Sequence, residues 1–194
     1  MQKLLLHICC GPCSAHPATL LSADYEVIGY FYNPNIWPYE EWIKRYEAFK
    51  KFCEESGAVK DFFPKNVFTE EEYLIEYKKY LEAVRGLEKE PEGGARCPVC
   101  FRFRIEETAR FAKEIGSPRY AGEAGADVFA TTLTIGRNKR PEIINPIGVA
   151  AAEKYGVRFF EANFKKQDGA LKGKKISDEH GLYRQHYCGC EFSL

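Results

Sequence analysis

The stretch that decides the fold is Lys-Leu-Leu-Leu-His-Ile-Cys at residues 3–9, followed by Cys-Gly-Pro-Cys-Ser at residues 10–14. The first part is a mostly apolar run of the length of a strand, and such runs are typical of strands buried on both faces. The second part supplies a turn, after which residues 15–21 favour a helix with Ser14 as its N-cap. A buried strand followed by a turn and a helix indicates a parallel α/β sheet.

The rest of the chain repeats this alternation of strands and helices. Thr69 followed by Glu72 has the pattern of a capping box that opens a helix. Further strands are predicted at residues 25–32, 59–63, 128–133 and 157–160, and further helices at residues 38–55, from Thr69, at residues 97–115 and from Asn145. The alternation predicts a single α/β domain over residues 1–194. The segment 163–194 lacks hydrophobic periodicity, and we expect it to form a loop and short helix that close over the site.

Size and composition fit such a domain. The chain has 194 residues, of which 45% are apolar and 29% charged, which suits one domain with a real core. Its formal net charge is zero, so binding to nucleic acid must come from a local patch. The apolar run near the N-terminus is too short for a signal peptide or a membrane span, which predicts a cytoplasmic protein without membrane contact.

The cysteines are grouped. Seven of the eight fall into three sets, which are Cys9, Cys10 and Cys13, then Cys97 and Cys100, then Cys188 and Cys190. Cys53 stands alone on a helix and is expected to be a core residue. In a reducing compartment, clustered cysteines more often bind metal or carry out redox chemistry than form structural disulfides.

Each set lies where a reactive site is expected. Cys9 and Cys10 follow the first strand, and ligands of open α/β sheets bind beyond the carboxyl ends of strands. Cys97 and Cys100 lie at a helix start, where the positive end of the helix dipole favours thiolates. The glycine between Cys188 and Cys190 allows a tight backbone.

Three interpretations compete. Four of the thiols could hold a structural zinc, or they could hold an iron–sulfur cluster, or a pair could act as a dithiol–disulfide couple. Seven thiols exceed the needs of one zinc, which favours a cluster on Cys9, Cys10, Cys97 and Cys100. Spacing alone does not distinguish iron from zinc. Cys188 and Cys190 could then bind a second metal with Cys13, cycle between dithiol and disulfide, or serve as extra structural ligands.

Five motifs together resemble one known family. They are Leu-His-Ile-Cys-Cys-Gly-Pro-Cys-Ser at 6–14, Arg-Cys-Pro-Val-Cys-Phe-Arg-Phe-Arg-Ile at 96–105, Phe-Ala-Thr-Thr-Leu at 129–133, Asn-Phe-Lys-Lys-Gln-Asp-Gly at 163–169 and Tyr-Arg-Gln-His-Tyr-Cys-Gly-Cys at 183–190. In this order they resemble the cobalamin-independent epoxyqueuosine reductases, the QueH family. The chain departs from the family at Ile135-Gly136, where Ser-Pro is usual, and at Asn163-Phe164-Lys165-Lys166, which is commonly Asp-Phe-Arg-Lys.

The resemblance implies an oxidoreductase that removes the epoxide oxygen of epoxyqueuosine in tRNA, with two electrons and two protons, to give queuosine. It implies a [4Fe-4S] cluster, an electron donor that the sequence does not identify, and a nucleotide-hydrolase-like (HUP or PP-loop-like) three-layer fold. Residues 9–14 would replace the phosphate-binding loop of that fold. Under this hypothesis Cys9, Cys10, Cys97 and Cys100 hold the cluster. Cys188 and Cys190, as a thiol pair or with a second mononuclear iron, act on the epoxide C–O bond.

A tRNA substrate requires cationic and aromatic contacts. The candidates for phosphate contacts are Lys165, Lys166, Lys172, Lys174, Lys175 and Arg184, which could equally form a solvated surface. Arg137, Lys139 and Arg140 form a second basic run with the same ambiguity. Tyr32, Trp37 and Tyr39 could stack on a base or belong to the core, and His7 is expected to be a strand residue with satisfied hydrogen bonds.

Two other functions compete with this hypothesis. An ATP-dependent tRNA thiolase of the PP-loop type should carry a glycine-rich phosphate loop, which this sequence lacks. A zinc-stapled RNA-binding module would use the same thiols and the same basic tail, without catalysis.

Overall fold

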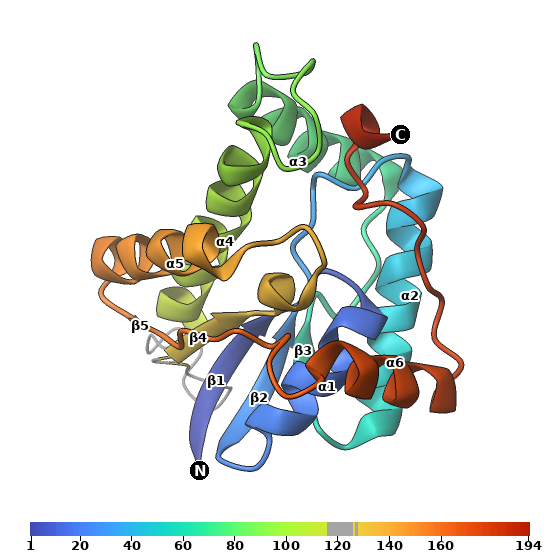
Figure 1. Cartoon of the computed structure of the whole chain (residues 1–194), viewed down its shortest axis with the longest axis vertical. Coiled ribbons are helices and arrows are strands. Elements are labelled where there is room, and N and C mark those ends of the chain that lie inside the picture. Colours follow the sequence, from blue (N-terminus) through green and yellow to red (C-terminus); the bar gives the residue numbers. More distant parts are fainter. Residues whose placement is uncertain (116–125, 127) are drawn as a thin grey trace.

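The computed structural model describes residues 1–115, 126 and 128–194. Its centre is a parallel sheet in the order β3-β2-β1-β4-β5 (Figure 1). The strands are β1 (Gln2–His7), β2 (Tyr25–Tyr30), β3 (Asp61–Phe63), β4 (Val128–Thr131) and β5 (Arg158–Phe159). All four pairings between neighbouring strands are parallel. The predicted α/β class and parallel sheet are therefore confirmed.

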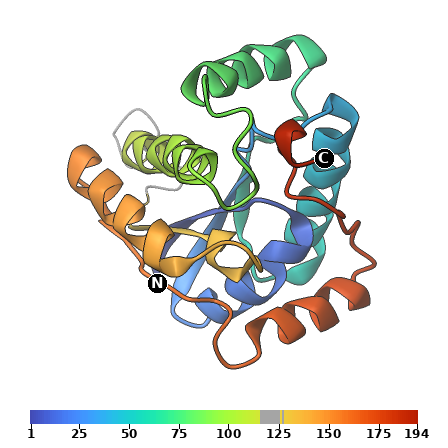
Figure 2. The same ribbon diagram turned by 45° about the horizontal axis from the view of Figure 1, so that its top comes forward.

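Six α-helices accompany the sheet within these described ranges. They are α1 (Gly11–Leu21), α2 (Tyr39–Ser56), α3 (Glu70–Ala83), α4 (Arg96–Ile115), α5 (Pro141–Tyr155) and α6 (Gly169–Glu179). The side chains of β1 alternate between two cores: Leu4 and Leu6 pack with α1 and α2, whereas Leu5 packs with α4 and α5. Figures 1 and 2 show these helix pairs on opposite faces of the sheet, with α6 beside α1.

Helix α1 begins at Gly11, so the prediction that Ser14 is its N-cap is wrong. The N-cap is Cys10, whose sulfur accepts a hydrogen bond from the backbone N–H of Cys13 at 3.3 Å. Pro12 occupies the first turn, where a missing N–H is tolerated. Cysteine is not among the usual capping residues, so the sequence pattern points to Ser14 instead. As a result Cys13 lies inside the first turn of the helix.

Helix α5 also begins earlier than predicted, at Pro141 instead of Asn145, and Pro146 lies inside it. Pro141 takes the first-turn position that proline favours. Residues Thr132–Ile135 form a short 3-10 helix, η2, so β4 ends before the predicted Leu133. The capping box of α3 is confirmed, since Thr69 Oγ1 accepts from Glu72 N at 3.2 Å and Glu72 Oε2 accepts from Thr69 N at 2.8 Å.

Within residues 1–115, 126 and 128–194, no helix has both the length and the apolar character that crossing a bilayer requires.

Candidate metal and redox site

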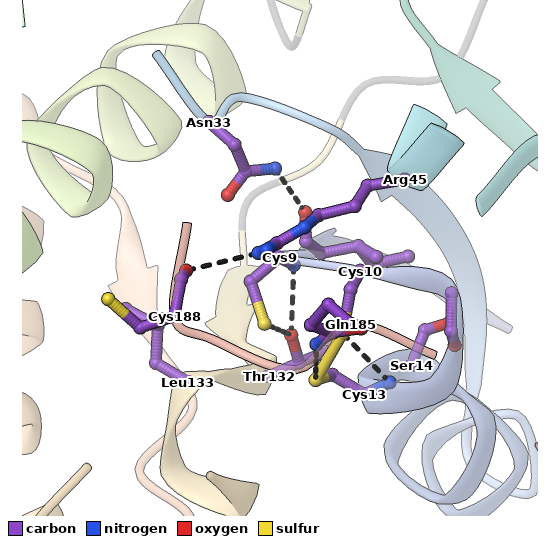
Figure 3. Close-up of a disulfide and its surroundings, with 12 residues drawn as sticks. Cys9, Cys10, Cys13, Ser14, Asn33, Arg45, Thr132, Leu133, Gln185 and Cys188 are labelled. Carbon is purple, nitrogen blue, oxygen red and sulfur yellow. Dashed lines mark hydrogen bonds between the residues drawn. A yellow bond between two sulfur atoms is a disulfide. The ribbon is translucent and has the colours of Figure 1, made fainter. Parts of the chain in front are cut away.

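The order of the sheet reverses at β1, which pairs with β2 on one side and with β4 on the other. Ligands of open α/β sheets bind beyond the carboxyl ends of the strands at such a reversal. Cys9 follows β1 and Thr132 follows β4 at this point, and the backbone N–H of Cys9 donates to Thr132 Oγ1 at 3.2 Å (Figure 3). The Thr132 hydroxyl in turn donates to Cys9 Sγ at 3.5 Å. The first cysteine set therefore lies at the predicted edge of the sheet.

Cys9, Cys10 and Cys13 form the first group of sulfurs, which all lie within 4.8 Å of one another. Cys10 and Cys13 are joined by a disulfide, and Gln185 Nε2 donates to Cys10 Sγ at 2.9 Å (Figure 3). Disulfide sulfurs carry no thiolate charge, so a metal bound by Cys10 or Cys13 requires the reduced pair. In that reduced form, this group could hold a metal ion.

The other four cysteines of the predicted site form a second group. Cys97 and Cys100 from α4, and Cys188 and Cys190 from the C-terminal segment 163–194, line one cavity. Tyr80 of α3 also lines this cavity, and its hydroxyl lies 3.2 Å from Cys190 Sγ. The fold thus brings all three cysteine sets to one edge of the sheet. It places Cys97 and Cys100 with the tail pair in one cavity, whereas the sequence grouped them with Cys9 and Cys10.

The tail reaches this cavity through backbone contacts to α2 and the segment before it. Arg45, which is buried and paired with Glu41 at 2.7 Å, donates to Cys188 O at 3.0 Å and Tyr187 O at 3.1 Å. Trp37 N donates to Gly189 O at 2.8 Å. Gly189 has a φ of +106°, and a Cβ there would lie 2.8 Å from Arg45 Nη1. Only glycine therefore fits between Cys188 and Cys190, which agrees with the predicted tight backbone.

The sulfurs differ in electrostatic surroundings. Burial raises the pKa of the Cys97 and Cys100 thiols. Burial acts in the same direction on Cys9, but the positive charges of Lys139 and Arg104 and the Thr132 hydroxyl outweigh it and lower the pKa of Cys9. Cys9 is therefore the thiol most readily ionised among these three.

His7 carries no charge at neutral pH. Burial and the nearby Arg104 charge lower its pKa to about 3, and its ring nitrogens lie 2.9 Å from Thr131 Oγ1 and 3.1 Å from Tyr32 O. The expectation of a strand residue with satisfied hydrogen bonds is confirmed.

A basic groove opens beside the disulfide. Its lining includes Cys13 and Gln185. Its cations are Arg137, Lys165, Lys174 and Arg184. Three predicted tRNA contacts, Lys165, Lys174 and Arg184, are therefore gathered around one groove, while Lys166, Lys172 and Lys175 are exposed outside its lining.

Comparison with known proteins decides the family. A family model described as "Epoxyqueuosine reductase QueH" matches residues 4–194. The chain is 38% identical over 197 residues to the epoxyqueuosine reductase QueH of Thermotoga maritima, covering 100% of this chain and 91% of the relative. It is 38% identical over 195 residues to that of Acinetobacter baylyi (100% and 81%), and 35% identical over 191 residues to that of Streptococcus pyogenes (98% and 70%).

The chain belongs to the epoxyqueuosine reductase QueH family. It is therefore an oxidoreductase, and the resemblance read from the five motifs is confirmed. The QueH match extends through both cysteine groups and the basic groove.

The aromatic residues considered for base stacking have intramolecular partners. The ring of Trp37 stacks on Tyr77 at 4.9 Å between centroids, and that of Tyr39 stacks on Trp42 at 6.3 Å. The hydroxyl of Tyr32 donates to Glu76 at 2.8 Å. Cys53 is buried in the core, as expected.

Four further residues contact the sulfurs or line the cavity, although no sequence pattern predicts these roles for them: Thr132, Arg104, Lys139 and Gln185. Thr132 and Gln185 lie inside the recognised motifs, but only the fold shows that they hydrogen-bond to sulfur. Arg104 follows Cys100 by one helical turn, among the buried residues Phe101, Ile105 and Thr108. A charged residue on the apolar face of a helix is the sequence signal that could have identified Arg104 as a functional residue. Lys139 belonged to a basic run but lines the thiol cavity.

Proposed function

We propose that this chain removes the epoxide oxygen of epoxyqueuosine in tRNA to form queuosine. Two electrons are delivered through a [4Fe-4S] cluster, two protons are taken up, and the oxygen leaves as water. One observation carries the proposal: four thiols from two distant segments, Cys97, Cys100, Cys188 and Cys190, line a single cavity, with Cys9, Cys10 and Cys13 at the same edge of the sheet. Family membership supplies the reaction class. The immediate electron donor is a further protein or small reductant.

The donor set fits an iron–sulfur cluster, because all the clustered ligand atoms are soft sulfurs. Cys9, Cys10, Cys97 and Cys100 are the proposed cluster ligands. Cys188 and Cys190 are the proposed catalytic pair, acting as thiols or holding a second mononuclear iron together with Cys13. When bound, the cluster supplies electrons one at a time.

The surrounding residues hold the cysteines in place and supply positive charge to the site. Tyr80 holds Cys190, and Arg45 holds the backbone of Cys188. Lys139 lines the cavity, and its ammonium group provides positive charge and a proton where the departing oxygen becomes negative. Phe101 also lines the cavity and would shield one side of the reacting bond from water.

The basic groove is the proposed path of the tRNA backbone. Arg137, Lys165, Lys174 and Arg184 would neutralise phosphates of the anticodon loop, with the modified base directed toward the cysteines. Exposed Lys166, Lys172 and Lys175 would contact phosphates farther along. The groove carries Cys13 in its lining, which joins this surface to the sulfur groups.

We also infer that residues 1–194 form a single nucleotide-hydrolase-like domain of three layers, with residues 163–194 as the segment that closes the site. The strand order and the position of Cys9–Ser14 directly after β1, where related folds bind phosphate, support this. Six free thiols favour the reducing cytoplasm as its location.

The test combines metal analysis with turnover. Protein purified without oxygen and reconstituted with iron and sulfide should hold four irons per chain in the cluster and convert epoxyqueuosine tRNA to queuosine tRNA with dithionite as reductant. Mass spectrometry of the digested nucleosides detects loss of one oxygen. The double variant Cys188→Ser, Cys190→Ser should keep the cluster spectrum and lose turnover.

Three results would contradict the proposal. A colourless protein that binds only zinc and yields no product would favour the RNA-binding module. Thiolated tRNA formed only with ATP would favour a thiolase. Full turnover by the double serine variant with its cluster intact would remove Cys188 and Cys190 from the chemistry.

A further inference from the structure

Three arginines are buried near the cysteines, and their partners differ. Arg45 is 2% exposed and pairs with the carboxylate of Glu41. Arg96 is 1% exposed and donates to several oxygens of the chain. These acceptors are Leu87 O, Glu88 O, Glu90 O, Phe192 O and Ser193 Oγ. Each of these two guanidinium groups is thus supplied with oxygen acceptors.

Arg104 is 3% exposed and has far fewer partners. Its Nη1 donates to Asn33 Oδ1 at 3.2 Å, and its Nε donates to Cys100 O at 3.4 Å. None of the ion pairs formed within residues 1–115, 126 and 128–194 includes Arg104. Burying a guanidinium without an anionic partner is costly, so the charge requires an anion close by.

The groups that can supply this anion are the cysteine sulfurs, once they are ionised or bound to a metal. Arg104 lines the same cavity as Cys97, Cys100 and Cys188. Its pKa is raised even though burial opposes this, because Cys100, Cys9 and Cys188 surround it. Arginine keeps its charge at every pH of interest, so this cation is permanent.

Hydrogen bonds through Arg104 also connect the segment of Cys9 with that of Cys100. Asn33 accepts from Arg104 and donates through Nδ2 to Ile8 O at 2.8 Å, directly before Cys9 (Figure 3 shows the Asn33 end of this link). The guanidinium is therefore tied to the end of β1 on one side and to α4 on the other. A fixed position is what an internal counter-ion needs, because a preorganised charge loses no energy in reorienting.

We propose that Arg104 is the internal counter-ion of the cysteine site, a positioning residue that stabilises the bound metal–thiolate centre and favours its reduced form. The effect on the reduction potential rests on the proposed function, because it requires the iron–sulfur cluster. Thiolate centres carry net negative charge, and reduction adds one more negative charge. A buried cation beside the sulfurs therefore strengthens metal binding and raises the reduction potential.

The test compares four proteins: wild type, Arg104→Met, Arg104→Lys and Arg110→Gln. Arg110 is the matched control, since it lies on the same helix, is exposed, and pairs with Glu107 and Glu114. Metal affinity is measured by chelator competition, and the cluster's reduction potential by spectroelectrochemical titration. In Arg104→Met, affinity should fall about 10–100-fold. The potential should fall by about 59 mV or more, a tenfold change for a one-electron step.

Arg104→Lys should retain most of both properties, and Arg110→Gln should match wild type. Unchanged affinity and potential in Arg104→Met would overturn the inference. Should that variant not fold, Arg104→Gln removes the charge, keeps a donor for Asn33, and carries the same expected losses.

Zinc binding distinguishes a failure of the proposed function from a failure of this inference. If the wild-type chain takes up no iron–sulfur cluster, the same competition with Zn²⁺ still applies, because zinc thiolates carry the same negative sulfurs. A 10–100-fold weaker zinc affinity in Arg104→Met would support the counter-ion role even then. Equal zinc affinity in both proteins would refute it.

Discussion

Two cysteines of this chain show how strongly surroundings decide the chemistry of a single residue. Burial raises the pKa of the Cys53 thiol, which lies against Gly29 and Phe49 and has the charge of Glu54 nearby. Cys9 is equally buried, yet its pKa falls because cations and a hydroxyl face it. The thiolate is the form of cysteine that binds metals and attacks electrophiles. Cys53 is therefore packing material, and Cys9 is a potential ligand.

Replacing Cys53 should accordingly leave the site intact. Cys53→Ala should lower the free energy of unfolding by about 1 kcal/mol through lost packing, while iron content and turnover match wild type. Urea denaturation and iron analysis check both. The comparison variant Cys100→Ala removes a thiol from the cavity and should lose iron. A loss of iron in Cys53→Ala would contradict the assignment of this residue to the core.

At the scale of elements, short connections do most of the positioning. The loop after η2 points Lys139 into the thiol cavity and Arg137 into the basic groove. Neighbouring side chains thus serve two different surfaces. The segment around Gly189 is also a short connection that positions side chains. Its backbone accepts hydrogen bonds from Arg45 and Trp37, which hold Cys188 and Cys190 near α4.

Gly189→Ala tests whether this tail geometry holds the site together. The left-handed φ of +106° and the 2.8 Å contact of a Cβ with Arg45 Nη1 should displace the tail and cost about 1–3 kcal/mol of unfolding free energy. Cys188 and Cys190 would leave the cavity, and turnover should be lost. Chemical denaturation and limited proteolysis of the tail provide the measurements.

Gly181→Ala is the matched control. Gly181 also has a positive φ, of +56°, but the nearest atom to a Cβ there is Lys51 Nζ at 3.7 Å. This variant should lose about 1 kcal/mol and keep turnover. Equal effects of the two substitutions would mean that the contact with Arg45 is unimportant.

The elements themselves were largely predictable, and their boundaries were less so. Apolar runs identified every strand found among the described residues, because buried parallel strands carry uniform hydrophobicity. The sequence does not indicate the start of α1, because a cysteine sulfur caps it, nor that of α5, because Pro141 rather than Pro146 opens it. The cysteine sets were visible in the sequence. Their pairing in space, and the roles of Arg104 and Lys139, depend on contacts between distant segments that no local pattern encodes.

At the scale of the whole molecule, charge is balanced overall and uneven locally. The formal net charge is zero, but four cations line one groove whose described lining contains no Asp or Glu. Such a groove attracts polyanions locally, whereas the rest of a molecule with zero net charge does not. We expect tRNA binding to depend on this surface and on salt.

The triple variant Arg137→Gln, Lys174→Gln, Arg184→Gln checks this. Removing three phosphate contacts should reduce the slope of log Kd against log salt by about two, with iron content unchanged. Filter binding of tRNA over a range of salt concentrations measures it. The control variant Lys78→Gln, Arg85→Gln, Lys113→Gln removes the same charge from exposed positions outside the groove. An equal loss of slope in the control would show a diffuse electrostatic effect.

The spacing of the cysteines along the chain has a consequence for biosynthesis. Ribosomes add about 5–20 residues per second, so Cys9, Cys10 and Cys13 emerge roughly ten seconds or more before Cys188 and Cys190. During that interval the cavity lacks one wall, whereas the Cys10–Cys13 pair spans only three positions and needs no other segment to form. The nascent chain therefore holds the Cys10 and Cys13 sulfurs close together well before the thiol cavity exists, and that cavity is complete only once the tail has been made.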